Sequence, residues 1–144
     1  MSVIKSILSS KGEEVVTIEP TATLEAAVNT LNQHRIGAIV VLGPDRRVTG
    51  IISERDVIRA LARDGAGVLK QTVGQVMTRK VATCTPTEAV GNLMETMTNG
   101  RFRHVPVVEQ DHLIGIISIG DVVKHRLKEI EQESAALRDY IQTA

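Results

Sequence analysis

The chain carries one eleven-residue pattern twice. Residues 48–58 read VTGIISERDVI and residues 113–123 read LIGIISIGDVV, and six of the eleven positions are identical, including Gly, Ser and Asp in the same register. Each copy predicts a buried strand that runs into Ser-x-x-Asp at the start of a helix. A tandem repeat this close requires a fold of two similar units, with two Ser-x-x-Asp sites related by pseudo-symmetry.

The repetition extends over most of each half. An apolar helical stripe in the first half returns in the second, and so does the short segment that precedes each unit. We expect a leading segment and repeat 1 in residues 1–68, repeat 2 in 69–126, and an extension of the last helix in 127–144. The matched sets are Leu24, Ala27, Val28 and Leu31 with Val90, Leu93, Met94 and Met97, and Ile4, Ile7, Leu8 and Ser9 with Val73, Val76, Met77 and Thr78.

The periodicity predicts β-α-β-β-α in each half. Thr23 is the expected N-cap of the first helix, and the second is expected to begin at Ser53, to bury Val57, Ile58, Leu61 and Ala62, and to end near Gly65. The order indicates an α/β (α+β) fold, with one sheet per repeat and the repeats packed about a pseudo-twofold axis. The strands are expected at 14–18, 37–42, 48–52, 81–83, 104–108 and 113–117, and the later helices begin at Thr87 and Ser118.

Composition narrows the class of protein. Seventeen basic and seventeen acidic side chains cancel, which argues against a chain that grips nucleic acid by bulk charge. No apolar run approaches the ~18 residues of a membrane span. A lone Cys84 permits no internal disulfide, and Met1-Ser2-Val3 does not open a secretory signal. We therefore expect a cytoplasmic protein.

Metal and catalytic patterns are weak. The four histidines have no partner at helical spacing, so the sequence predicts no metal site. The residues before Ser53 do not form a nucleophile elbow, and neither repeated serine has a histidine close in sequence. Cys84 is expected to be a small core residue. These features predict a protein that is not an enzyme and has no catalytic cofactor.

Ser53-x-x-Asp56 and Ser118-x-x-Asp121 have two interpretations. Each is a capping box, in which hydroxyl and carboxylate satisfy the free amides of a helix start. Each also suits a nucleotide, because a carboxylate can accept from both ribose hydroxyls and a serine at a helix N-terminus can meet a phosphate. The Asp persists in both halves while its neighbours change from Glu54-Arg55 to Ile119-Gly120. This persistence favours the nucleotide.

The repeat order, the doubled Gly-Ile-Ile-Ser-x-x-Asp-Val and the RFRHVPVV strand at 101–108 resemble the cystathionine beta-synthase (CBS) domain pair, or Bateman module. The resemblance covers the chain from about residue 4 to the last helix, and it implies a stand-alone pair. It implies adenosine-containing ligands, such as AMP, ATP, NAD(H) or S-adenosylmethionine, in clefts between the repeats. Many members also form flat disc-shaped dimers.

The resemblance also implies roles for single residues. Asp56 and Asp121 would hold ribose hydroxyls, and Ser53 and Ser118 the ribose or phosphate. Aromatic stacking is not expected to be the main grip, since Phe102 is the only aromatic candidate nearby. The residues expected to line the cleft or to wall the adenine are Thr17, Thr83 and Ile18.

The two halves differ around their motifs. Repeat 2 has Arg101-Phe102-Arg103-His104 where repeat 1 has Arg35-Ile36-Gly37-Ala38, and Arg55 precedes Asp56 where Gly120 precedes Asp121. Arginine suits bidentate phosphate binding. We therefore expect two unlike clefts, with Arg101 and Arg103 supplying the phosphate contacts of the Asp121 motif. The alternative is that these are solvated charges at a strand edge.

The last helix carries an apolar seam. Its members recur at intervals of 4, 3, 4, 3 and 4, close to the spacing of paired helices. The seam predicts packing against a second subunit, against the leading segment, or against the helix's own domain. Its members are Val123, Leu127, Ile130, Ser134, Leu137 and Ile141.

Together these features predict a non-catalytic adenine-nucleotide sensor that transmits ligand state to a regulated protein, as a homodimer. AMP is the favoured ligand, with NAD(H) or ATP as further candidates, because the arginine pair favours phosphate over the sulfonium of S-adenosylmethionine. The alternative is a ligand-free scaffold or dimerisation module in which Ser-x-x-Asp only caps helices.

Overall fold

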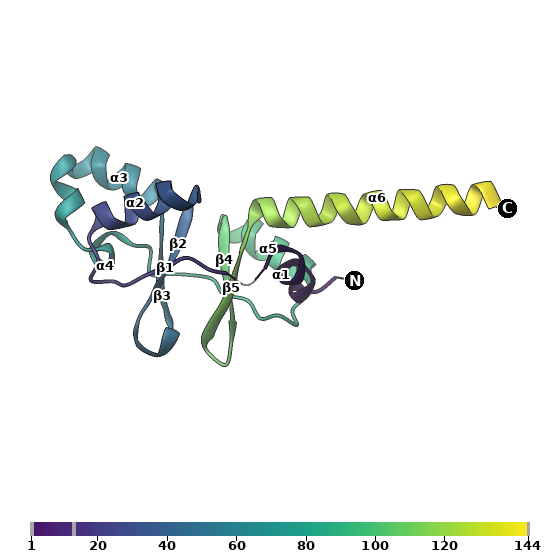
Figure 1. Ribbon diagram of the computed structural model, residues 1–144, viewed down its shortest axis with the longest axis horizontal. Helices are drawn as coiled ribbons and strands as arrows, with labels where there is room; N and C mark the ends of the chain where they lie inside the picture. The colour runs from purple at the N-terminus through teal and green to yellow at the C-terminus, as the bar shows by residue number, and fades with distance from the viewer. Residues whose placement is uncertain (1, 13, 144) are drawn as a thin grey trace.

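The computed structural model describes residues 2–12 and 14–143, and it places the two repeats side by side (Figure 1). Mixed helix and strand content confirms the expected α/β (α+β) class. Repeat 1 comprises β1 (Thr17–Ile18), α2 (Leu24–His34), β2 (Ala38–Leu42), β3 (Val48–Ser53) and α3 (Glu54–Asp64), and repeat 2 comprises α5 (Val90–Gly100), β4 (His104–Glu109), β5 (His112–Ser118) and α6 (Ile119–Thr143). Short helices α1 (Ile4–Lys11) and α4 (Val73–Val76) precede the repeats, and two 3-10 helices, η1 (Pro44–Arg46) and η2 (Ala66–Lys70), lie in repeat 1 and after it.

Each repeat is built on an antiparallel hairpin. β2 pairs with β3 and β4 pairs with β5, each in antiparallel register. In repeat 1, β1 adds a parallel strand at the β2 edge. The strand expected at 81–83 is replaced by a single parallel bridge between Cys84 and Val107. Pro106 explains the difference, because it lacks the N–H that a longer parallel ladder would need there.

Two helices depart from the sequence prediction. Helix α5 begins at Val90 and not at Thr87, because the backbone before it is used elsewhere: the Ile4 N–H donates to the Glu88 carbonyl over 2.9 Å, and the Val90 N–H to the Ser2 carbonyl over 3.0 Å. In α3, Ala60 is buried beside Val57, whereas Ile58 is 64% exposed. The inner face is therefore rotated from the predicted one.

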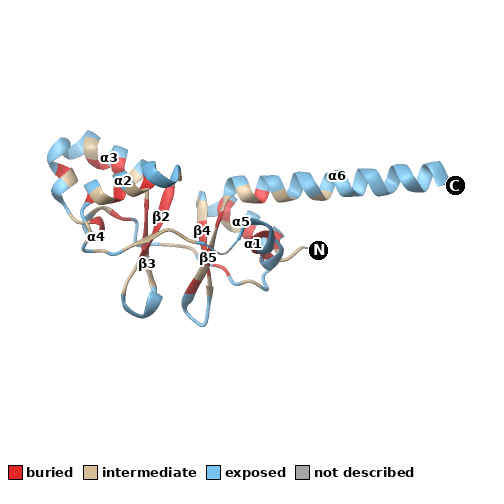
Figure 2. Cartoon of the chain, in the orientation of Figure 1, coloured by how far each residue is buried: buried red, intermediate tan, exposed pale blue. Residues whose placement is uncertain are grey.

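The hydrophobic core is divided in two, and the leading helices α1 and α4 are crossed between the halves. Side chains of α1 (Ile4, Ile7 and Leu8) pack with α5, β4, β5 and Val122 of repeat 2. In the same way Val73 and Met77, at α4, complete the core of repeat 1. Figure 2 shows the buried residues gathered around the two hairpins. Each repeat is therefore completed by the segment that leads into the other.

The two repeated glycines permit this crossing. A Cβ on Gly50 would lie 2.7 Å from the Sδ of Met77 and from the carbonyl oxygen of Thr78, and one on Gly115 would lie 2.6 Å from Leu8 Cδ2. Both distances are shorter than van der Waals contact allows. The shared Gly is therefore a packing requirement, since each leading segment lies directly on the opposite hairpin.

Helix α6 leaves the body of the molecule (Figures 1 and 2). Its first turns pack on α1 through Val122, and residues 131–143 are all exposed. The first turns of α6 thus pack on the leading segment and on repeat 2, as two of the alternatives predict, whereas the exposed residues 131–143 pack on neither. Across residues 2–12 and 14–143, no helix combines the length and apolarity needed to span a bilayer.

Candidate functional site

The first Ser-x-x-Asp motif lies where β3 ends and α3 begins. Ser53 is the N-cap: its Oγ accepts from the Asp56 N–H over 3.3 Å, while Asp56 Oδ2 accepts from the Ser53 N–H over 2.9 Å and from its hydroxyl over 3.0 Å. Asp56 Oδ1 accepts from the Thr78 hydroxyl over 3.0 Å. The capping box is thus complete, and the carboxylate is also held by a residue that follows α4.

A cavity of about 240 Å³ opens over this motif, between the two repeats. It brings together seven of the residues singled out from the sequence: Ser53, Arg55, Asp56, Arg101, Phe102, Arg103 and His104. Glu54, Arg59, Thr78 and Lys80 also line it, and were not predicted. Both Arg59 and Thr78 could have been found from the sequence. Arg59 lies one helical turn after Asp56, and Thr78 matches Ser9 in the internal repeat.

The cavity is predominantly cationic. Five side chains carry positive charge, from Arg55, Arg59, Lys80, Arg101 and Arg103, against the carboxylates of Glu54 and Asp56. Charges of one sign in a partly enclosed space reinforce one another, because the low-dielectric walls concentrate the field. The arrangement suits an anionic ligand whose neutral part carries hydroxyl donors for Asp56.

The arginine pair lies elsewhere than expected. Arg101 and Arg103 line the cavity of the Asp56 motif and not that of Asp121. The start of β4 faces the start of α3 across the two repeats: a Cβ on Gly37 would lie 3.5 Å from Glu54 Oε1 and 3.8 Å from His104 Cε1. Arg101 caps the C-terminus of α5 in a left-handed conformation (φ 57°). The preceding Gly100 leaves room for the Phe102 ring, which would lie 2.2 Å from an added Cβ.

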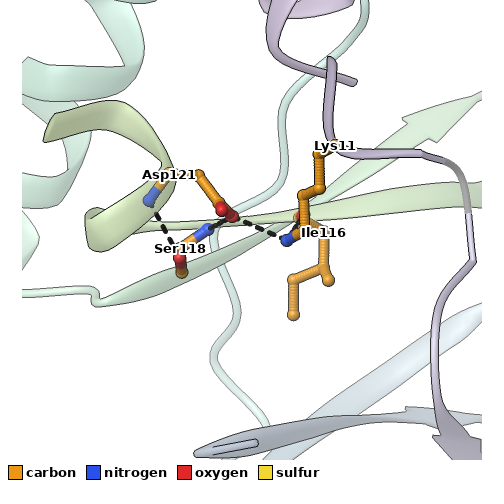
Figure 3. Close-up of polar contacts among 4 residues, drawn as sticks. All are labelled: Lys11, Ile116, Ser118 and Asp121. Carbon is orange, nitrogen blue, oxygen red and sulfur yellow. Dashed lines mark hydrogen bonds and ion pairs between the residues drawn. The ribbon is translucent and has the colours of Figure 1, made fainter. Parts of the chain in front are cut away.

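The second motif has the same cap but a different partner (Figure 3). Asp121 Oδ2 accepts from the Ser118 N–H over 2.8 Å and from the Lys11 ammonium over 2.6 Å. Lys11 donates as well to the Ile116 carbonyl over 2.7 Å. Burial alone would raise the pKa of Asp121, but the hydrogen bonds from Lys11 and Ser118 and the charge of Lys11 hold it below its usual value.

A separate cavity of about 280 Å³ lies beside Asp121, between α1 and α6. Its cations are lysines, Lys11, Lys124 and Lys128, with His125. The two motifs are therefore unlike, as expected, but the difference comes from these three lysines and not from the arginine pair. In the first cavity a neutral hydroxyl meets the aspartate, and in the second an ammonium neutralises it.

His104 lies between the two motifs. Burial lowers its pKa, and the charges of Lys11 and Arg103 lower it further, against the opposing effects of Asp121 and Glu54. An imidazole kept neutral can accept as well as donate a hydrogen bond. His104 therefore adds no fixed charge to the first cavity at neutral pH.

Four predicted residues lie outside the cavities described above. Thr17 and Ile18 form β1, where they pair with Val40 and Val41, and Ile18 packs against the first core. Thr83 precedes the Cys84 bridge, and Ser118 caps the start of α6, where its Oγ accepts from the Asp121 N–H. These residues therefore have structural roles that their sequence positions do not distinguish from ligand contact.

Cys84 is a core residue. It is 4% exposed, and burial, with the nearby charge of Glu88, raises the pKa of its thiol to about 12. A thiol protonated at physiological pH is a poor nucleophile. In the part of the chain that the structure describes, no three histidine, cysteine or acidic side chains gather as metal ligands.

Known proteins resemble this arrangement over both repeats. The family model for the CBS domain matches residues 4–63 and 73–128. A mitochondrial CBS domain-containing protein of Arabidopsis thaliana is 36% identical, over 96% of this chain and 71% of its own length. The crystal structure of a CBS-domain-containing protein of Agrobacterium tumefaciens is 49% identical, with a TM-score of 0.83 over 87% of this chain and 99% of that one.

A second similar structure was solved with ligands. It is a CBS domain pair in complex with 5′-methylthioadenosine and S-adenosyl-L-methionine, 26% identical to this chain, with a TM-score of 0.76 over 85% of this chain and 98% of that one. Both of those ligands contain adenosine.

Proposed function

Because the chain belongs to the CBS domain family, with two such domains in tandem, we propose that it is a non-catalytic regulatory module that binds an adenine nucleotide in the Asp56 cavity. The observation that carries the proposal is the convergence of Asp56 with Arg101 and Arg103 in one cavity between the repeats. Asp56 accepts from the ribose hydroxyls, and the arginines bind the phosphate. The adenosine ligands of the similar CBS pair support the same ligand class.

The size of the cavity favours a mononucleotide. Small-molecule sites are commonly about 300–1,000 Å³, and this one measures about 240 Å³. The second nucleotide of NAD(H) would extend beyond its walls. The five cations favour phosphate over the positive sulfonium of S-adenosylmethionine. AMP is therefore the preferred ligand, ahead of ATP and NAD(H).

We propose that only one of the two motifs is open to ribose. The Asp121 carboxylate is paired with Lys11 at 2.6 Å, and a ribose would have to displace this ammonium. Asp56, in contrast, accepts only from hydroxyl and amide donors among residues 2–12 and 14–143. Titration of the purified protein with AMP, monitored by calorimetry, is expected to give one site per chain. If the folded protein binds none of AMP, ATP, NAD and NADH, the proposal is wrong.

Two variants separate ribose binding from helix capping. Asp56→Asn retains an oxygen that accepts from the Ser53 N–H, so it is expected to leave stability nearly unchanged, but it loses the charge that ribose needs. The AMP affinity is expected to fall about tenfold or more. Asp64→Asn, an exposed residue at the other end of α3, is the matched control. Equal AMP affinity for Asp56→Asn and wild type contradicts the ribose role.

Arg103→Ala tests the phosphate contact. It is expected to weaken AMP binding while leaving adenosine binding unchanged, because adenosine has no phosphate. Equal losses for both ligands indicate instead that Arg103 supports the cavity walls.

The alternative function is a ligand-free scaffold. Both capping boxes are complete within the protein, which is the observation that favours it. In the regulatory function, AMP binds one of two conformations of the protein more tightly and shifts the equilibrium towards it, and the partner protein responds to that shift. Matched hydrogen-exchange profiles with and without AMP distinguish the two: a scaffold is expected to show no change.

A further inference from the structure

The outer half of α6 is a helix with an unburied apolar face. Residues 131–143 are exposed throughout, and Leu137 and Ile141 are 59% and 65% exposed. A lone helix of about a dozen residues is marginal in water. Large apolar side chains on such a helix require a partner to be stable.

The seam lies on a different face from the one that packs on the body. The buried or half-buried side chains of the first turns are Asp121, Val122, His125 and Glu129. At ~100° per residue, the seam through Leu127 and Ile130 lies roughly a third of a turn away. The body therefore does not block the seam, and 56% of Leu127 is exposed although it lies close to the globular part.

The spacing of the seam fixes a heptad assignment. Three heptads are present, and an interval of 4 always leads from d to a and one of 3 from a to d. Leu127, Ser134 and Ile141 are therefore a positions, and Val123, Ile130 and Leu137 are d positions. The flanking e positions are Lys124, Glu131 and Arg138, and the g positions are Arg126, Glu133 and Tyr140.

The flanking charges identify the partner and its direction. In a parallel pair, each g residue faces the e residue five positions later on the other helix. Arg126 then faces Glu131, and Glu133 faces Arg138, so every such pair of charged residues is attractive, twice per dimer. This pattern is complementary to itself, as a second copy of the chain requires.

The antiparallel pairing is repulsive. With a and d layers aligned over the whole seam, e faces e and g faces g. Glu131 then meets Glu131, Glu133 meets Glu133, and Lys124 meets Arg138. Ser134 gives the same preference, because the parallel pair lets the two hydroxyls meet across the axis, whereas the antiparallel pair places each against Ile130.

We propose that the α6 helices of two copies of this chain form a parallel two-stranded coiled coil over 123–143, with both bodies at the same end. The inference goes beyond the ligand function and does not depend on it. The coiled coil begins in the last turns of repeat 2, where Lys124 also lines the cavity beside Asp121. The Asp56 cavity has no residue from α6 in its lining, so it stays open.

Seam substitution is the first test. Leu137→Asp is expected to convert the dimer into a monomer by light scattering, while Gln132→Asp, on the outer face, leaves it dimeric. Both sites lie far from the body, and unchanged thermal unfolding of the repeats shows that the fold is intact. A wild-type monomer, or a dimer that persists in Leu137→Asp, overturns the proposal.

Cross-linking tests the direction. Ser134→Cys is expected to form a disulfide dimer on mild oxidation, because the two a positions face each other, and Gln132→Cys is not. Cys84 is buried and does not interfere. A dimer in which Ser134→Cys fails to cross-link is not parallel and overturns the assignment.

Charge exchange tests the partner. Arg126→Glu with Arg138→Glu makes every g–e contact acidic, and Glu131→Arg with Glu133→Arg makes every contact basic. Each double variant is expected to be monomeric at a concentration where wild type is dimeric. Their mixture is expected to give a dimer containing one of each, and two monomers in the mixture contradict the coiled coil.

Discussion

Asp56 and Asp121 hold the same place in the repeat and differ in what they meet. Asp56 receives a hydroxyl from Thr78, whereas Asp121 receives the ammonium of Lys11. Both donors come from the segments that lead into the repeats. The chemistry of each motif is thus set by a residue outside the motif, and this difference was not evident from the doubled Ser-x-x-Asp.

Lys11→Met is expected to open the second motif. Removing the ammonium leaves the Asp121 carboxylate free to accept from ribose, and AMP calorimetry is expected to rise from one site per chain to two. Lys5→Met, exposed on the same helix, is the control. One site in both variants indicates that Lys11 does not close the motif.

Lys11→Met also has an expected cost in stability. The partly exposed ion pair contributes at most about 1 kcal/mol after screening by solvent. The folded-state pKa of Asp121 is lowered from 3.8, so this contribution is present above that value and is lost as the pH falls through the folded-state pKa. Urea unfolding at neutral and acidic pH measures both effects.

His104 makes the free energy of unfolding depend on pH as well, but here the folded protein favours the neutral form of the side chain, whereas at Asp121 it favours the charged form. Its folded-state pKa lies below the ordinary 6.5, so between the two values the unfolded chain binds more protons and stability rises with pH. The contribution of the neutral imidazole is complete above about pH 6.5 and falls as the pH drops through the folded-state pKa. His104→Gln is expected to flatten this slope in urea unfolding, while His112→Gln, on an exposed residue, leaves it in place.

At the scale of elements, the hairpins followed from pattern and the helix starts did not. Apolar runs predicted the positions of the strands that became β2, β3, β4 and β5, and their pairing into hairpins depends on contacts that are local in sequence. Helix α5 starts late because residues 2–5 bond to the backbone before it. The third strand of repeat 2 is lost because Pro106 has no N–H to offer. The first difference depends on residues distant in sequence and the second on one missing N–H group, and hydrophobic periodicity carries information on neither.

Gly50→Ala tests the close approach of a leading segment to a hairpin. The new methyl would lie 2.7 Å from the Thr78 carbonyl, a backbone atom that cannot turn away. We expect a loss of about 1–3 kcal/mol in the free energy of unfolding. Gly91→Ala, in α5 with open space around it, is expected to stabilise by roughly 0.5–1 kcal/mol. Equal effects at the two sites contradict the packing role.

At the scale of the whole molecule, the two halves are held together because each packs the leading helix of the other into its core. The sequence predicted two similar units, and each leading segment was expected to belong with the repeat that follows it. The structure packs α1 in the core of repeat 2 and the α4 region in the core of repeat 1. Sequence similarity identified the matched segments, but it carries no information on which copy of a repeated partner each one contacts.

The exchange predicts damage on the opposite side of the molecule. Ile4→Ala removes a fully buried side chain and is expected to cost about 2–5 kcal/mol. Hydrogen-exchange protection is expected to fall first in β4 and β5, which begin 100 residues further along the chain. Val73→Ala is the mirror variant and is expected to weaken β2 and β3. Loss confined to residues adjacent in sequence contradicts the exchange.

The crossed leading helices also bear on how the two clefts can diverge. A chain of one repeat would complete its core only by trading helices with another copy, and symmetry would then make both clefts identical. Joining the repeats in one polypeptide removes that constraint, since each cleft is encoded separately. A lysine can occupy one and a threonine the other, so a single chain can hold one cleft open while keeping the other shut.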